Sequence, residues 1–137
     1  MKIRSLTLSF ALVSIVSVLA LAVPMFAHHG TGASYAMDKK VTLKGTVTEF
    51  RLMNPHCQLY FDVRDASGNI TGWAGELNSP SVLGREGWTK HQFKAGDQIT
   101  ITVFPSKAGA LVGVVDRTRP IFVDGKEAVK ANARNVN

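Results

Sequence analysis

The sequence predicts an all-β domain with one short helix, most simply a five- to six-stranded OB-like Greek-key barrel. Short segments with apolar residues at every second position recur between turn residues, as expected for half-buried strands. Three such segments come first, a short helical segment follows, and two or three further strands complete the order typical of this barrel. A small immunoglobulin-like sandwich is the alternative, but it would require about seven strands and no central helix.

The first strand begins at Val41, where Val41, Leu43, Gly45 and Val47 alternate with polar residues up to Thr48. The second strand has the same period, so that one set of side chains faces the core and the other faces solvent. The inward set is Cys57, Leu59, Phe61 and Val63, and the outward set is His56, Gln58, Tyr60 and Asp62.

A hairpin turn at 67–69 leads into the third strand, 70–77, in which Trp73 shares the inner face and Glu76 lies on the outer face. Ser79 or Asn78 can cap a short helix that has Pro80 in its first turn. Strands then follow at 98–104, 110–115 and 121–123. The domain is therefore expected to span residues 41–125, after an extended arm at 28–40 and before a polar tail at 126–137.

The amino terminus has the pattern of a secretory signal peptide, with Lys2 and Arg4 ahead of an apolar run at 6–23. Pro24 ends this run. We expect cleavage after Ala27, with Ala22 as the alternative site and an uncleaved membrane anchor as the alternative interpretation. The protein is then expected to work in the periplasm as a single domain of about 110 residues.

Composition excludes several classes of function. The loss of residues 1–27 removes two basic residues from a formal net charge of +6, and no dense basic patch remains that would indicate nucleic-acid binding. The single cysteine, Cys57, excludes an intramolecular disulfide. No Gly-x-Ser-x-Gly or phosphate-binding loop is present, so no catalytic residue is predicted.

Histidines are the strongest candidates for a functional site. After cleavage at Ala27, His28 would offer its α-amine and its ring to one metal ion, a donor set that Cu(II) favours. His56 is expected to point outward from the second strand, with His29 or Glu76 as a further ligand or Glu76 as a hydrogen-bond partner of an imidazole. Met53 is a weaker candidate, more suited to Cu(I). His91 lies in a polar loop segment and is expected to be solvated.

A second hypothesis uses the outward face of the second strand. Tyr60, Gln58 and Asp62 would there form a non-catalytic binding surface for a small ligand or a partner protein of the cell envelope. A copper-dependent redox enzyme is the third hypothesis.

The motifs, taken in order, resemble a family of small exported bacterial proteins of uncharacterised function. The resemblance runs from His28 to about Val115 and is carried by the segments His28-His29-Gly30, 41–47, Met53-Asn54-Pro55-His56, Gly72-Trp73-Ala74-Gly75-Glu76, Ser79-Pro80, Gly87-Trp88-Thr89 and 94–97. It implies a Gram-negative periplasmic setting and no defined activity. The leading hypothesis is a periplasmic copper carrier or buffer, with copper as its cofactor.

Overall fold

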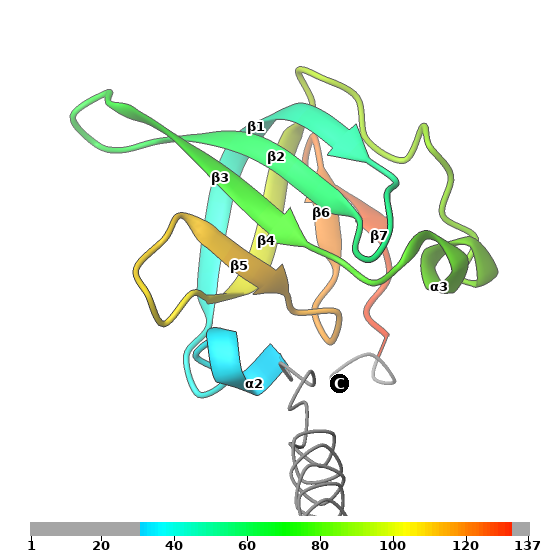
Figure 1. Cartoon of the computed structure of the whole chain (residues 1–137). Coiled ribbons are helices and arrows are strands. Elements are labelled where there is room, and N and C mark those ends of the chain that lie inside the picture. The colour runs from blue at the N-terminus through cyan, green and yellow to red at the C-terminus, as the bar shows by residue number, and fades with distance from the viewer. Residues whose placement is uncertain (1–30, 133–137) are drawn as a thin grey trace, which may run out of the picture.

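The computed structural model describes residues 31–132, which form a β-barrel with two short helices (Figure 1). Their order along the chain is α2 (Thr31–Ser34), β1 (Val41–Arg51), β2 (Gln58–Arg64), β3 (Ile70–Glu76), α3 (Pro80–Arg85), β4 (Gln98–Pro105), β5 (Val112–Val115), β6 (Ile121–Val123) and β7 (Lys126–Val129).

Five strands close the barrel in the order β1-β2-β3-β5-β4, and β4 pairs again with β1. The long strand β1 makes this closure possible, because its first half pairs with β4 and its second half with β2. Strands β3 and β5 are parallel, whereas the other pairs in the sheet are antiparallel. β6 and β7 extend the sheet beyond β4. The predicted all-β barrel is confirmed, and closure excludes the sandwich.

The inward-facing residues of the strands meet in one core, as their alternation predicts. Cys57, Leu59 and Phe61 are fully buried, while Val63 and Trp73 are partly buried against this core. Helix α3 covers one end of the barrel through Leu83. It begins after Ser79 with Pro80 in its first turn, as expected.

Two predicted boundaries are corrected by the structure. Within the expected arm, residues 31–34 form α2, and Tyr35 is buried and forms a β-bridge to Ser106. The expected tail begins too early, because Lys126–Val129 pairs with β6 and Val129 is buried. Asp124 and Gly125 both have positive φ and make a tight hairpin between β6 and β7, so the domain continues beyond the expected boundary at residue 125.

The predicted signal peptide and the histidines at positions 28 and 29 lie outside the described residues. Within residues 31–132, no helix has the length and hydrophobicity needed to cross a membrane.

Gly45 is required where β1 passes from β4 to β2. A Cβ at this position would lie 2.6 Å from the carbonyl oxygen of Asp62 and 2.8 Å from the ring of Phe61. Gly84 in α3 is the opposite case, because a Cβ there would meet nothing within 4 Å.

We therefore predict opposite effects of two alanine substitutions. Gly45→Ala should lower the free energy of unfolding by about 2 kcal/mol, since the contacted backbone cannot move aside without breaking the ladder. Gly84→Ala should raise it by about 0.5 to 1 kcal/mol, because alanine favours the helix. Urea unfolding followed by tryptophan fluorescence measures both changes, and equal effects would contradict the contact at Gly45.

Candidate functional site

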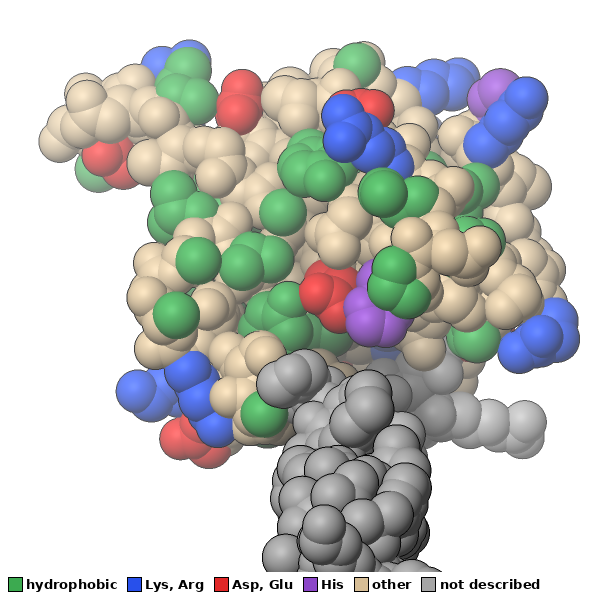
Figure 2. All heavy atoms as spheres, viewed as in Figure 1, with side chains coloured by type: hydrophobic (Ala, Val, Ile, Leu, Met, Phe, Trp, Pro, Cys, Tyr) green, Lys and Arg blue, Asp and Glu red, His purple; other side chains and the backbone are tan. Residues whose placement is uncertain are grey.

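Three side chains from distant parts of the chain form a continuous hydrogen-bonded group, which we call the His56 cluster: His56, Glu76 and Tyr35. The Nδ1 atom of His56 lies 2.6 Å from Oε1 of Glu76, and the hydroxyl of Tyr35 donates a 2.6 Å hydrogen bond to Oε2 of the same carboxylate. Figure 2 shows a histidine and an acidic side chain in contact on this face of the molecule. Both carboxylate oxygens of Glu76 therefore have partners inside the cluster.

Strand register explains why His56 meets Glu76. Gln58 pairs with Glu76 across β2 and β3, so His56, two residues earlier, is the diagonal neighbour of Glu76 on the same face. The main chain after His56 is fixed, because the amide of Leu77 donates to the carbonyl of Cys57 and the amide of Cys57 donates to the carbonyl of Asn78. His56 thus projects from a tethered segment.

Tyr35 reaches the cluster from the opposite end of the sequence. Its β-bridge to Ser106 and the hydrogen bond from the amide of Ala36 to the carbonyl of Pro105 attach residues 35–36 to the end of β4. In Figure 1, α2 lies beneath β5, and Tyr35 follows it directly. The amino-terminal segment is therefore attached to the barrel beside Glu76.

The hydrogen bond to Glu76 indicates which ring nitrogen of His56 is available to a ligand. A carboxylate accepts hydrogen bonds, so Nδ1 of His56 carries the proton and Nε2 keeps its lone pair in the neutral ring. The side chain of His56 is 52% exposed, whereas that of Glu76 is 20% exposed. Burial, followed by the hydrogen bond to Glu76, raises the pKa of Tyr35 well above its usual range, so this hydroxyl remains a donor.

This arrangement suits a metal-binding histidine. Such histidines donate their second ring nitrogen to a carboxylate, which holds the ring orientation and strengthens the ligand. The contacts of Glu76 are those of a hydrogen-bond partner of His56. Within residues 31–132 no group of three or more His, Cys, Asp or Glu side chains gathers as a complete metal site.

The other predicted site residues make none of the hydrogen bonds of the cluster, although Gln58 is the cross-strand neighbour of Glu76. Tyr60 and Asp62 border a shallow groove on the outer face of β2 and β3, while Gln58 does not line it. Arg51 lies over the ring of Tyr60, 5.1 Å from its centroid. Met53 and His91 are exposed, and Cys57 is fully buried, with burial raising the pKa of its thiol. His28 and His29 lie outside the described residues.

Sequence reasoning missed Tyr35, Asp116 and Arg117. A tyrosine in a glycine-rich segment has no periodic neighbours that would indicate burial, although a buried tyrosine usually has a hydrogen-bond partner. Asp116 and Arg117 lie in a charged stretch that resembles a surface turn, yet both are buried.

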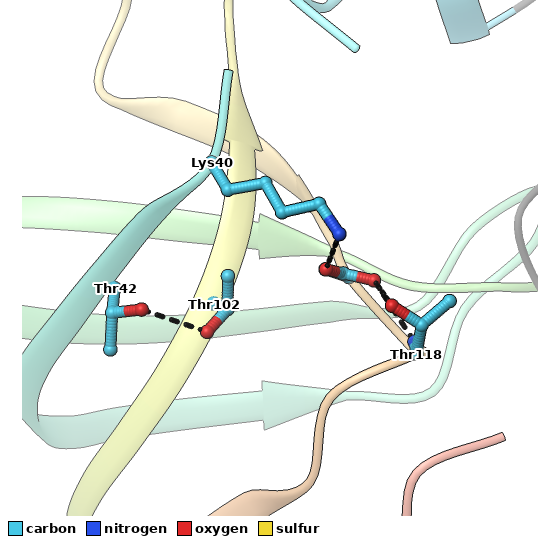
Figure 3. A network of polar contacts seen from close by, with 5 residues as sticks. Lys40, Thr42, Thr102 and Thr118 are labelled. Carbon is cyan, nitrogen blue, oxygen red and sulfur yellow. Dashed lines mark hydrogen bonds and ion pairs between the residues drawn. The ribbon is translucent and has the colours of Figure 1, made fainter. Parts of the chain in front are cut away.

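Asp116 is held by a polar network beside β4 (Figure 3). The ammonium of Lys40 lies 2.8 Å from its Oδ2 atom as an ion pair, and both the hydroxyl and the amide of Thr118 donate to Oδ1. Burial opposes ionisation, but Lys40 and Thr118 outweigh it and lower the pKa of Asp116. The network attaches the start of β1 to the segment that follows β5.

Arg117, the residue after Asp116, is also buried and makes contacts with Trp88 and Glu86. Its guanidinium lies 4.4 Å from the ring centroid of Trp88, and its Nη2 atom donates to Oε2 of Glu86 at 3.0 Å. These contacts join the β5–β6 connection to the end of α3. We assign to these contacts a role in stabilising the fold.

We predict that Tyr35→Phe will lower the free energy of unfolding by about 1 to 2 kcal/mol, because a hydrogen bond to a charged group is lost while the ring stays in place. Urea titration measures the change. Tyr60→Phe is the matched control and should change stability by less than about 0.5 kcal/mol, since Tyr60 is half-buried and its charged neighbour, Arg51, is exposed to solvent. Equal losses in the two variants would contradict the role of the Tyr35 hydroxyl.

Comparison with known protein families assigns this chain to one of them. The model of a family of unknown function (DUF6152) matches residues 15–125, which is most of the chain, and the protein belongs to this family. The matched range includes His56, Glu76 and Tyr35. A search of curated proteins finds no match.

Proposed function

We propose that the protein is a copper-binding carrier or buffer of the bacterial periplasm, with His56 as the ligand on the folded domain. The observation that supports this proposal most strongly is the His56 cluster. The half-exposed imidazole of His56 uses Nδ1 to contact the carboxylate of Glu76, which leaves Nε2 available to a metal ion. A histidine that was only a solvated surface residue would not need the second support that Tyr35 provides to Glu76.

The attachment of Tyr35 supports the participation of the amino-terminal histidines. His29 and His28 precede Thr31 by two and three residues, so they lie within roughly 7 and 11 Å of it at about 3.6 Å per residue. Because Tyr35 is bound to Glu76, and Glu76 contacts His56, we propose that these histidines share a metal ion with His56.

The proposed ligands are the α-amine and ring of His28, the ring of His56 and, as a fourth donor, His29. Nitrogen-rich, tetragonal sites of this kind favour Cu(II) over other common divalent ions. The α-amine becomes a ligand only if the signal peptide is cleaved after Ala27. The exposure of His56 favours reversible binding and exchange, which suits a carrier better than a closed structural site.

Native mass spectrometry of untagged protein recovered from the periplasm tests this proposal. We expect a chain that starts at His28 and gains one copper ion on addition of Cu(II). A chain with a different first residue and no stoichiometric copper would contradict the proposal.

A second candidate function, a binding module for a ligand or partner of the cell envelope, is favoured by the groove beside Tyr60. This groove of about 310 Å³ lies over the small residues Gly72 and Ala74, with Tyr60 and Leu111 on its sides.

A further inference from the structure

The first half of β3 has a free edge. β5 pairs with β3 only from Ala74 to Glu76, and β3 begins four residues earlier, at Ile70. Among residues 31–132, β2 alone pairs with Ile70, Thr71 and Gly72. In Figure 1 the β2–β3 hairpin projects beyond the closed part of the barrel.

The backbone groups on this edge are oriented for a further strand. The amide of Ala74 donates to the carbonyl of Leu111, which shows that the N–H group of Ala74 points away from β2. Backbone direction alternates along a strand, so the N–H and C=O groups of Gly72 and Ile70 also point away from β2. These four groups form a short, regular hydrogen-bonding edge.

The side chains next to this edge are apolar and unequal in size. Ile70 is 54% exposed and Leu111 47% exposed. Gly72, two residues after Ile70 on the same face, leaves a gap, since a Cβ built on it would meet only a carboxylate oxygen of Asp62 at 3.8 Å. Hydrophobic side chains gather over β3 and β5 in Figure 2.

We propose that a second copy of this chain covers the edge, with the two β3 strands paired antiparallel about a two-fold axis at Thr71. In this register Ile70 of each copy lies opposite Gly72 of the other, and the four outward backbone groups of each strand bond to their counterparts. Each isoleucine then enters the groove beside Tyr60, Ala74 and Leu111 of the other copy.

Two features favour a second copy over an unrelated peptide. The protruding residue and the gap are separated by two positions on one strand, which is the spacing that two-fold pairing requires. Charge also agrees, because Asp62 is the neighbour of Gly72 on β2 and Arg64 is the neighbour of Ile70. Where Ile70 of one copy lies opposite Gly72 of the other, the adjacent β2 strands would then place Arg64 of the first copy and Asp62 of the second in line with this pair.

Sedimentation velocity of the protein recovered after export tests the proposal. Protein concentrations between about 10 μM and 1 mM cover the dissociation range expected for a dimer with a small interface. EDTA is added so that copper cannot bridge two chains. We expect a dimer that dissociates on dilution. Ile70→Lys should weaken dimerisation at least about tenfold, because both copies lose an apolar cross-strand pair and gain a charge at the edge. Leu52→Lys, at an exposed apolar residue elsewhere, is the matched control and should leave the dimer unchanged.

A crosslinking experiment tests the register. In antiparallel pairing Thr71 faces its own equivalent at a Cα separation of about 4.5 Å, within disulfide range. In Thr71→Cys, diamide should oxidise the two introduced thiols to one interchain disulfide, while Ala66→Cys at the hairpin tip should react no faster than by random collision. A monomer at every concentration, a dimer that survives Ile70→Lys, or a monomer that carries another peptide in native mass spectra would each overturn the proposal.

Discussion

Replacing His56 with alanine is expected to weaken Cu(II) binding at least about a hundredfold, because the domain loses its one positioned imidazole ligand. Loss of an outer hydrogen-bond partner alone costs ten- to a hundredfold in metal affinity, and loss of the ligand should cost no less. Competition titration against a chelator of known affinity measures the change. The fold should be unaffected, because the ring of His56 is half exposed.

Two further variants test whether the effect is specific to the His56 cluster. Glu76→Gln removes the charge that holds Nδ1 of His56 and should cost about ten- to a hundredfold in copper affinity. His91→Ala is the matched control, since His91 is an exposed histidine outside the cluster, and it should bind copper as the unmodified protein does. An unchanged affinity in His56→Ala, or an equal loss in His91→Ala, would reject the proposed site.

Lys40→Met is expected to cause the largest loss of stability, about 3 kcal/mol at pH 7. The substitution leaves the carboxylate of Asp116, which is fully buried, without its cationic partner. Removing one member of a buried ion pair typically costs about 3 to 5 kcal/mol, and the half-exposed position of Lys40 places the value at the lower end. Urea unfolding measures the difference, with Lys44→Met, an exposed lysine on the same strand, as the control.

The loss should depend on pH in a defined direction. The pKa of Asp116 is lower in the folded protein than its ordinary value of 3.8, so the ionised carboxylate stabilises the fold above that value. This contribution disappears as the pH falls through the folded pKa. In Lys40→Met the buried carboxylate can instead be protonated, so the deficit relative to the unmodified protein should shrink towards pH 3 to 4. A deficit that stays constant with pH would show that Lys40 acts through packing alone.

The barrel could be predicted from sequence because its strands have one buried face, and alternation at every second residue reports that burial directly. The same signal placed His56 and Glu76 on the outer face of neighbouring strands, where the structure shows them in contact. Alternation could not decide whether Glu76 binds a metal or supports His56. The contact itself depends on the register that makes the two side chains diagonal neighbours.

The missed features depend on contacts that no alternation pattern reports, and those of Tyr35 and Asp116 join segments distant in sequence. Tyr35 is buried because the chain returns to the end of β4, and no local pattern reports this. Val129 is buried because a two-residue turn at Asp124 and Gly125 folds β7 back onto β6. Asp116 can be buried only because Lys40, remote in sequence, neutralises it.

The most direct test of the copper proposal is pulsed EPR of the Cu(II)-loaded protein, which detects the remote nitrogen of each coordinated imidazole. The account predicts an imidazole signal in the unmodified protein that loses one ring's contribution in His56→Ala and none in His91→Ala. Spectra without imidazole coupling, or identical spectra for the unmodified protein and His56→Ala, would contradict copper binding at the His56 cluster.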